Sequence, residues 1–200
     1  MSPVTHLFVS WVIAAKTTNN PRDCRLVTLA GILPDADGLG LIVDAASRAL
    51  GYRGTLFYEH YHHFLSHGIY GGIAIAALMT CFARQRWRVA LLALLVFHVH
   101  LLCDLVGSRG PDPVDLWPIF YLGPISKNVM WIWKGQWQLD AWPNRILSVV
   151  MFIWSLKIAV QLGHSFIGVF NRRLDEIFVG VLRKWDNGWK ARHNKQVKTG

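Results

Sequence analysis

The chain has 200 residues, of which 52% are apolar and ten are tryptophan, and its formal net charge is +9. Together with a mean hydropathy of +0.28, this composition argues against a soluble protein and indicates a single membrane-embedded chain of ordinary domain size. The three cysteines have no CxxC spacing, which argues against a disulfide framework.

Two short apolar runs lie near the start of the chain, at residues 7–15 and 26–33, on either side of the polar turn KTTNNPRDCR. A bilayer core about 30 Å thick needs roughly 20 apolar residues per helical span, so neither run crosses alone. We predict a helical hairpin that dips into the membrane or packs on the bundle. No basic residue precedes the first run and no clear cleavage site follows it, so we expect no cleavable signal peptide.

Three longer apolar runs follow, at residues 69–83, 87–106 and 146–170. The first is short but compatible with a helix, and the other two are long enough to cross a membrane. The prolines, glycines and tryptophans of residues 107–145 indicate a structured loop region at the membrane interface. We therefore predict an all-α membrane bundle with about three spanning helices.

The last thirty residues are basic and carry apolar side chains at helical spacing. These apolar positions are Leu174, Ile177, Phe178, Val181, Leu182 and Trp185. We predict an amphipathic helix that lies on the bilayer. The chain would then consist of a membrane-embedded, metal-binding helical domain at residues 1–170 and a basic cytoplasmic tail at residues 171–200.

Positive charge gathers on one predicted face of the membrane. The turn at residues 16–25, the link at residues 84–88 and the tail hold a large excess of lysine and arginine, whereas the opposite face is slightly acidic. The positive-inside tendency places the C-terminus in the cytoplasm. We expect a multi-pass protein of the bacterial inner membrane.

Four groups of metal-ligand residue types interrupt the apolar runs, and the predicted topology brings all of them to the periplasmic end. They are His6, Asp35 with Asp37, His62 with His67, and His100 with Asp104. His100 and Asp104 share one helix face about one turn apart, so both side chains can reach one ion. Ionisable residues within an apolar helix are costly and indicate function, although a buried histidine bonded to aspartate is the alternative.

The other groups are less specific. In EHYHHFLSHG, helical spacing favours His63 with His67 as ligands, and a histidine-rich surface patch is the alternative. The two carboxylates of LPDAD point apart on an extended or turn backbone, so one can bind metal while the other orients or accepts a proton. An aspartate after proline is also an ordinary helix cap or turn.

These groups also carry a resemblance. Thr5-His6, Leu33–Asp37, His62–His67 and His100–Asp104, followed by Gly110 and Leu116-Trp117-Pro118, resemble the YdjM-type family of bacterial inner-membrane proteins, which are thought to be metal-dependent hydrolases. That family is in turn similar to the zinc-dependent phospholipase C and S1-P1 nuclease group, helical proteins whose histidine and aspartate ligands hold zinc for phosphate-ester hydrolysis. Such kinship alone does not fix function.

Position by position, the resemblance implies that His62 and His67 are the histidine ligands, whereas helical spacing favours His63. The family usually has arginine where this chain has His63, and both residues stay candidates. Gly38 stands where the family has a further histidine, which leaves the number of metal ions open between one and three.

Metal-assisted hydrolysis is the chemistry that we predict, with Zn²⁺ as the expected ion and activated water as the nucleophile. Asp35 is the candidate that orients or deprotonates the water. Arg109 is the candidate that neutralises a substrate phosphate, although a cation in a membrane-surface loop is an equally good interpretation. A site at the lipid interface favours a lipid or a lipid-linked phosphate ester as substrate.

Two non-enzymatic alternatives use the same residues. The ligands could hold a structural metal in a membrane interaction or regulatory protein. The basic tail, KWDNGWKARHNKQVK, could bind anionic lipid, nucleic acid or a cytoplasmic protein. Tryptophan mixed with lysine and arginine is more typical of a membrane-surface helix, so we expect lipid contact and no nucleic-acid binding.

Overall fold

The computed structural model describes residues 1–52, 56–58 and 64–199, with side chains up to residue 191. It is mostly helical, as predicted. The helices are α1 (Pro3–Thr17), α2 (Pro21–Ala30), η1 (Leu33–Leu39), α3 (Gly40–Ala49), α5 (Ile69–Phe82), α6 (Arg86–Gly107), α7 (Trp142–Leu162), η2 (Phe166–Val169) and α8 (Arg172–Thr199). Two short strands, β1 (Ile119–Phe120) and β2 (Met130–Trp131), pair antiparallel in the loop before α7.

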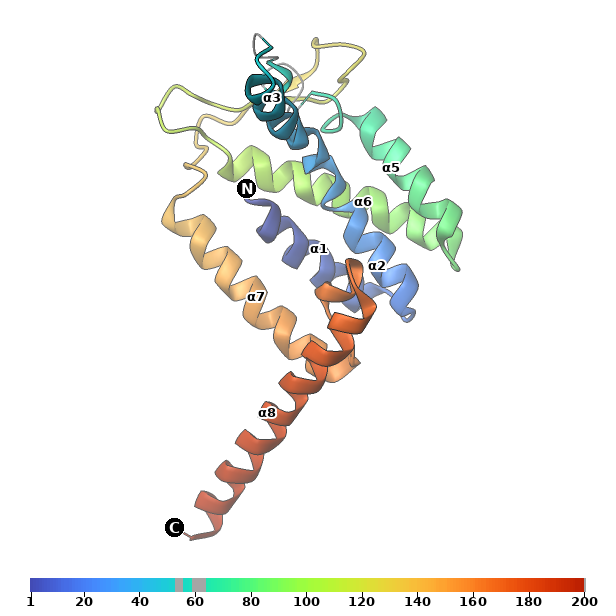
Figure 1. Cartoon of the computed structure of the whole chain (residues 1–200), viewed down its shortest axis with the longest axis vertical. Coiled ribbons are helices and arrows are strands. Elements are labelled where there is room, and N and C mark those ends of the chain that lie inside the picture. Colours follow the sequence, from blue (N-terminus) through green and yellow to red (C-terminus); the bar gives the residue numbers. More distant parts are fainter. Residues whose placement is uncertain (53–55, 59–63, 200) are drawn as a thin grey trace.

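The predicted N-terminal hairpin is present as α1 and α2 (Figure 1). The Ser2 hydroxyl accepts the Thr5 N–H at the start of α1, and the Asn20 side chain accepts the Arg22 N–H at the start of α2. Helix α1 packs against α2, α6 and α7, and its Trp11 is fully buried. The first helix is therefore the centre of the bundle, which places whatever its N-terminal turn carries inside the protein.

Among the described residues, two helices are long and apolar enough to cross a membrane: α6 with 22 residues and α7 with 21. Helix α5 has 14 residues, or about 21 Å, which is too short to span alone. The run at residues 69–83 therefore forms a helix, as expected, and it is not one of the candidate spans. The third candidate span combines α2 with the segment formed by η1 and α3. A short break separates α2 from this segment, and the chain bends there by 50°. The LPDAD carboxylates lie just after this bend.

The last predicted span, residues 146–170, is also corrected. Helix α7 begins earlier, at Trp142, and ends at Leu162, where Gly163 adopts the left-handed conformation with φ 81°. Glycine reaches this conformation without steric cost, so it terminates the helix inside an apolar run. The Ser165 hydroxyl then accepts the Ile167 N–H and starts η2, and the chain turns into α8.

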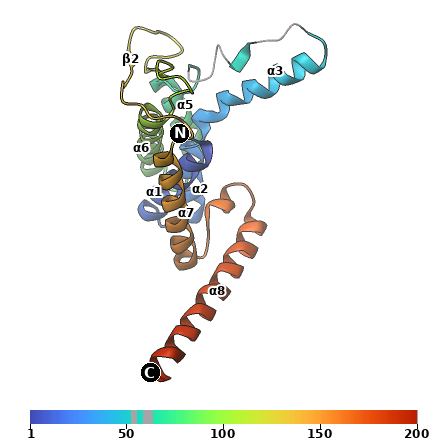
Figure 2. The same cartoon turned by 90° about the vertical axis from the view of Figure 1, so that its left-hand side faces the viewer.

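The predicted amphipathic tail helix is α8, which has 28 residues and extends away from the bundle (Figures 1 and 2). Its apolar positions divide into two sets instead of forming one lipid-facing stripe. Phe178 and Leu182 pack against the core, whereas Leu174, Ile177 and Trp185 are exposed. The first turns of α8 thus belong to the bundle.

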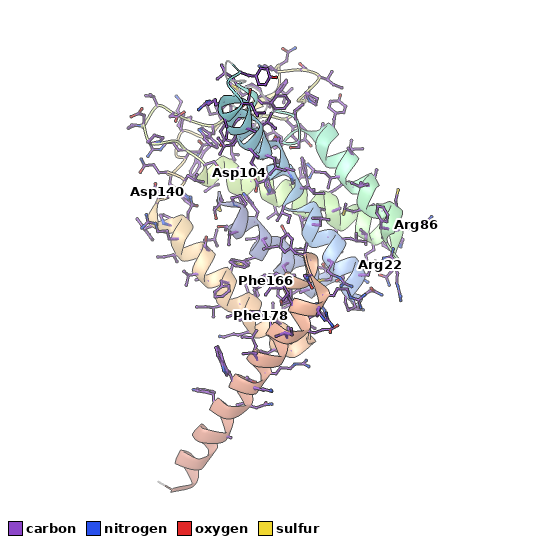
Figure 3. All side chains as sticks on the ribbon, viewed as in Figure 1. Arg22, Arg86, Asp104, Asp140, Phe166 and Phe178 are labelled. Carbon is purple, nitrogen blue, oxygen red and sulfur yellow. The ribbon has the colours of Figure 1, made fainter. Side chains whose placement is uncertain are left out.

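The two ends of α6 differ in charge. Arg86 lies at its start, close to Arg22 of α2, while Asp104 lies in its last turn at the opposite end (Figure 3). The loop after α6 covers that last turn, and the Gln136 side chain fixes the loop by accepting the Trp117 N–H and donating to the Trp117 carbonyl. The loop region was predicted as structured, and it closes the acidic end of the bundle.

Candidate metal centre

Four side chains from three elements converge at the acidic end of the bundle. They are His6 of α1, Asp35 of η1, and His100 and Asp104 of α6, and each offers a nitrogen or oxygen atom within 4.8 Å of the others. His67, which precedes α5, lies beside them with its Nε2 atom 3.2 Å from Nε2 of His100. We call these five residues the His/Asp cluster.

The hydrogen bonds of two histidines fix where their lone pairs point. His100 Nδ1 lies 2.9 Å from the Gly31 carbonyl oxygen, which can only accept, so Nδ1 carries the hydrogen. His67 Nδ1 lies 3.0 Å from an Asp37 carboxylate oxygen and is likewise the donor. In the neutral rings both Nε2 atoms therefore present lone pairs to each other. Two lone pairs this close need a proton or a cation between them.

The carboxylates add negative charge to the same point. Asp104 Oδ2 lies 3.0 Å from Nε2 of His100 and 3.7 Å from Nε2 of His67. Asp35 Oδ1 lies 3.7 Å from Nε2 of His100 and 3.9 Å from Nε2 of His67. Imidazole nitrogens and carboxylate oxygens are the donor set that Zn²⁺ accepts in proteins, so the cluster fits that ion.

Two buried carboxylate oxygens in the cluster, Oδ2 of Asp35 and Oδ2 of Asp104, have no hydrogen-bond partner among the described residues. The other oxygen of Asp104, Oδ1, has three polar partners. It lies 3.0 Å from Nε2 of His6, it accepts the Ser108 hydroxyl at 2.8 Å, and it accepts the amino group of Met1. Burial of an unpaired carboxylate oxygen is costly, and a bound cation would remove this cost.

Asp37 lies one step outside the cluster. Its carboxylate accepts the Ser66 hydroxyl at 2.9 Å as well as His67 Nδ1. Asp35 and Asp37 thus face different partners, as the spacing of LPDAD predicted. The arrangement gives Asp37 the role of orienting a histidine, which is typical of the carboxylates behind metal-bound imidazoles.

The remaining predicted residues are placed differently. His62 and His63 lie outside the described residues, so the choice between them stays open. Arg109 is not part of the His/Asp cluster. Its Nε donates to the Gln136 carbonyl at 3.1 Å, and its buried Nη1 has no partner within the described part of the chain. It lines a pocket of about 310 Å³ with Trp117 and Leu139.

A second pocket, of about 320 Å³, leads to the cluster itself. Asp35, Tyr58, Trp117 and Leu139 are among its lining residues, so it adjoins the pocket of Arg109 through the last two. Burial raises the pKa of Tyr58, and the charges of Asp37 and Asp35 raise it further. Tyr58 therefore remains a neutral phenol beside this opening, which we call the cluster pocket.

Three supporting groups were not predicted from the sequence: the Gly31 carbonyl, the Ser66 hydroxyl and the Ser108 hydroxyl. A Cβ atom at residue 31 would collide with the Ser10 side chain on α1, so glycine is needed for the close approach. Ser108 lies four residues after Asp104, and that helical spacing is a usable signal. The Gly31 carbonyl leaves no side-chain signal because it is a backbone atom.

No curated protein and no solved structure is significantly similar to this chain. The proposed kinship to zinc-dependent phospholipases and nucleases therefore stays a prediction. The helices from α1 to α7, η2, the bend after α2 and the His/Asp cluster all lie within residues 1–170. The model of one family, described as the YdjM inner membrane protein, matches these same 170 residues, and the chain belongs to that family.

Proposed function

We propose that this protein is a membrane-bound, metal-dependent hydrolase that cleaves a phosphate ester of a lipid or lipid-linked molecule. One observation carries the proposal: the Nε2 lone pairs of His67 and His100 point at each other beside Oδ1 of Asp35 and Oδ2 of Asp104. A proton or a cation must compensate this arrangement when it is buried, and a metal ion would also satisfy the carboxylates. Zn²⁺ is the ion that the donor set favours.

Different roles follow for the cluster residues. His6, His67, His100 and Asp104 would hold the metal, which in such sites acts as a Lewis acid and activates water at neutral pH. Asp35 is the most open of the carboxylates, with 14% of its side chain exposed against 3% for Asp104. It lines the cluster pocket, so its carboxylate can orient an incoming water and accept its proton.

Arg109 suits the binding of the substrate phosphate. Its unpartnered Nη1 and the adjoining pockets would allow a phosphate oxygen or a charged headgroup to meet the guanidinium beside the cluster. The long axis of α6 separates this region from Arg22 and Arg86 (Figure 3). With the basic end in the cytoplasm, the proposed active site faces the periplasm, and the basic tail contacts the anionic lipid surface.

A structural metal in a non-catalytic interaction protein is the second candidate. The burial of His6 and His100, each 1% exposed, favours it, because structural sites are closed. The opening at Asp35 favours the hydrolase, because catalytic sites keep a position for water. Hydrolysis therefore separates the two candidates, and metal content alone does not.

The test compares metal content and activity in detergent. The parent protein is expected to carry at least about one equivalent of zinc by elemental analysis, and the His100→Ala, Asp104→Ala double variant is expected to carry almost none. The matched control is His98→Ala, Asp112→Ala, which removes the same residue types outside the cluster and is expected to keep the metal. Hydrolysis of bis-p-nitrophenyl phosphate should follow the metal. A parent that takes up no zinc on titration refutes the proposal, and a zinc-loaded parent without hydrolase activity on phosphate esters favours the structural metal.

A further inference from the structure

A groove reaches Asp35 from the apolar side of the bundle. It encloses about 500 Å³, which is within the range of roughly 300–1,000 Å³ that is typical of small-molecule sites. Its walls include Val4 and Leu7 of α1, Leu29 of α2, Leu33 and Leu39 of η1, and Phe170. Among the described lining residues, Asp35 is the only ionisable one. We call this opening the tail groove.

The rim of the tail groove is apolar and open. Val4, Leu39 and Phe170 are 54%, 58% and 68% exposed. Contiguous apolar surface of this kind is unfavourable in water but suits a protein that faces hydrocarbon. The groove is formed by α1, the α2–η1 bend and the residue that follows η2. Helix α3 and the beginning of α8 extend to the same side of the bundle (Figure 2). A hydrocarbon chain can therefore enter it sideways from the bilayer.

The tail groove adjoins the cluster pocket. Pro3, Asp35 and Leu39 line both, so the two openings meet at the carboxylate that is most exposed in the His/Asp cluster. An occupant of both would be apolar on one side of Asp35 and polar on the other. Such a molecule has the composition of a lipid, and a soluble phosphate ester or a nucleic-acid strand lacks the apolar part.

We infer that the tail groove binds one hydrocarbon chain of a membrane phosphate ester and thereby places the ester at the His/Asp cluster. The placement of the ester for cleavage rests on the proposed function, whereas binding of the chain rests on the groove alone. The headgroup side would then extend through the cluster pocket toward Arg109, because Trp117 and Leu139 line both the cluster pocket and the pocket of Arg109. The tail groove thus selects the substrate class and the cluster supplies the chemistry.

The test is photo-crosslinking in nanodiscs of phosphatidylcholine with a dihexadecyl phosphate that carries a diazirine in one chain. Labelled peptides are expected to cover residues 3–7 and 29–39, and excess unlabelled dihexadecyl phosphate should abolish this labelling. Inorganic phosphate should not compete, because it cannot fill an apolar groove. The Val4→Trp variant fills the groove and should lose the competed labelling. Val149→Trp is the matched control on α7, where Val149 is 56% exposed, and it should keep the labelling.

Labelling that excess lipid does not compete, or that Val4→Trp leaves unchanged, would show contact with bulk lipid only and would overturn the tail groove. Phe170→Ser changes the groove outside the cluster and should give the same loss if Val4→Trp does not fold. Competed labelling in a protein that binds no zinc would refute the hydrolase and keep the groove. Zinc-dependent hydrolysis of a soluble ester without competed labelling would refute the tail groove and keep the hydrolase.

Discussion

The bundle buries aspartates at both of its ends, and their hydrogen bonds differ. At the basic end, Asp23 accepts the backbone N–H groups of Arg84 and Gln85, and Asp175 accepts both the N–H and the hydroxyl of Ser165. At the other end, Asp35 and Asp104 each keep one buried oxygen without a hydrogen bond in the described part of the chain. Burial alone therefore does not separate a structural aspartate from a functional one.

The difference lies in what compensates the charge. Backbone N–H groups at helix ends are available as soon as the chain folds, so Asp23 and Asp175 stabilise the fold without a ligand. Oδ1 of Asp35 and Oδ2 of Asp104 face the Nε2 atoms of His67 and His100 instead, and a proton or a bound cation offsets that arrangement. Substitution of Asp23 or Asp175 should lower stability, and substitution near Asp35 and Asp104 should lower metal affinity.

The largest expected effect concerns Asp37. Its carboxylate is paired by hydrogen bonds, like those of the aspartates at the basic end, but it lies at the cluster end. Asp37→Asn keeps the shape of the side chain and weakens the bond to His67 Nδ1, which holds that ring in place. We expect zinc affinity to fall about 10- to 100-fold, as for other carboxylates behind metal-bound histidines. Competition with a chromophoric chelator in detergent measures the affinity.

Asp23→Asn is the matched control for this experiment, since it makes the same change at the basic end and should leave zinc affinity unchanged. If Asp37→Asn binds zinc as tightly as the parent, His67 is not a ligand that depends on Asp37. The cluster would then be reduced to His6, Asp35, His100 and Asp104.

Much of this site could be predicted from the order of the apolar runs. A chain that crosses the bundle back and forth returns to the same end, so His6, the LPDAD carboxylates, His67 and Asp104 gather there whatever the details of packing. The four-residue spacing of His100 and Asp104 also fixes their common face. The sequence predicted the split between Asp35 and Asp37 from an extended or turn backbone, whereas both residues lie in the 3₁₀ helix η1, whose three residues per turn also point them in different directions. Which of them faces the cluster depends on tertiary contacts.

Other features leave no readable signal in the sequence. Gly163 ends α7 inside an apolar run, and one glycine in such a run is compatible with a continuing helix. Arg109 follows the last turn of α6, but its direction is set by the Gln136 carbonyl, which lies 27 residues further along the chain. Long-range contacts with backbone atoms decide both outcomes, and local patterns do not record such contacts.

The structural aspartates give the next largest effect. Asp23→Ala removes the acceptor of two N–H groups at the start of α6, and we expect the free energy of unfolding to fall by about 1–3 kcal/mol. Thermal unfolding in detergent measures the change, and zinc content should stay at the parent level. The control is Asp140→Ala, whose side chain is 79% exposed and should shift stability by less than about 0.5 kcal/mol. If Asp23→Ala lost zinc but kept the stability of the parent, the distinction between structural aspartates at the basic end and metal-binding aspartates at the cluster end would be wrong.

The smallest predicted effect concerns His164, which follows α7 at the basic end and packs edge-on against Trp11. Burial lowers the pKa of His164, and Asp175 opposes this only in part. An unfolded histidine titrates near about pH 6.5, so below this pH the unfolded chain binds the additional proton first. The contribution of His164 to stability is therefore complete above about pH 6.5 and is lost as the pH falls toward the lowered pKa of the folded protein.

The His164→Gln variant should reduce the decrease in unfolding temperature between about pH 7.5 and about pH 5.5. The measurement is made on metal-free protein, because cluster histidines also release zinc when they are protonated and would add a second pH dependence. The side chain is only partly buried, so the change should be smaller than that of Asp23→Ala. A variant whose pH profile matches that of the parent would mean that groups other than His164 determine the acid sensitivity of the fold.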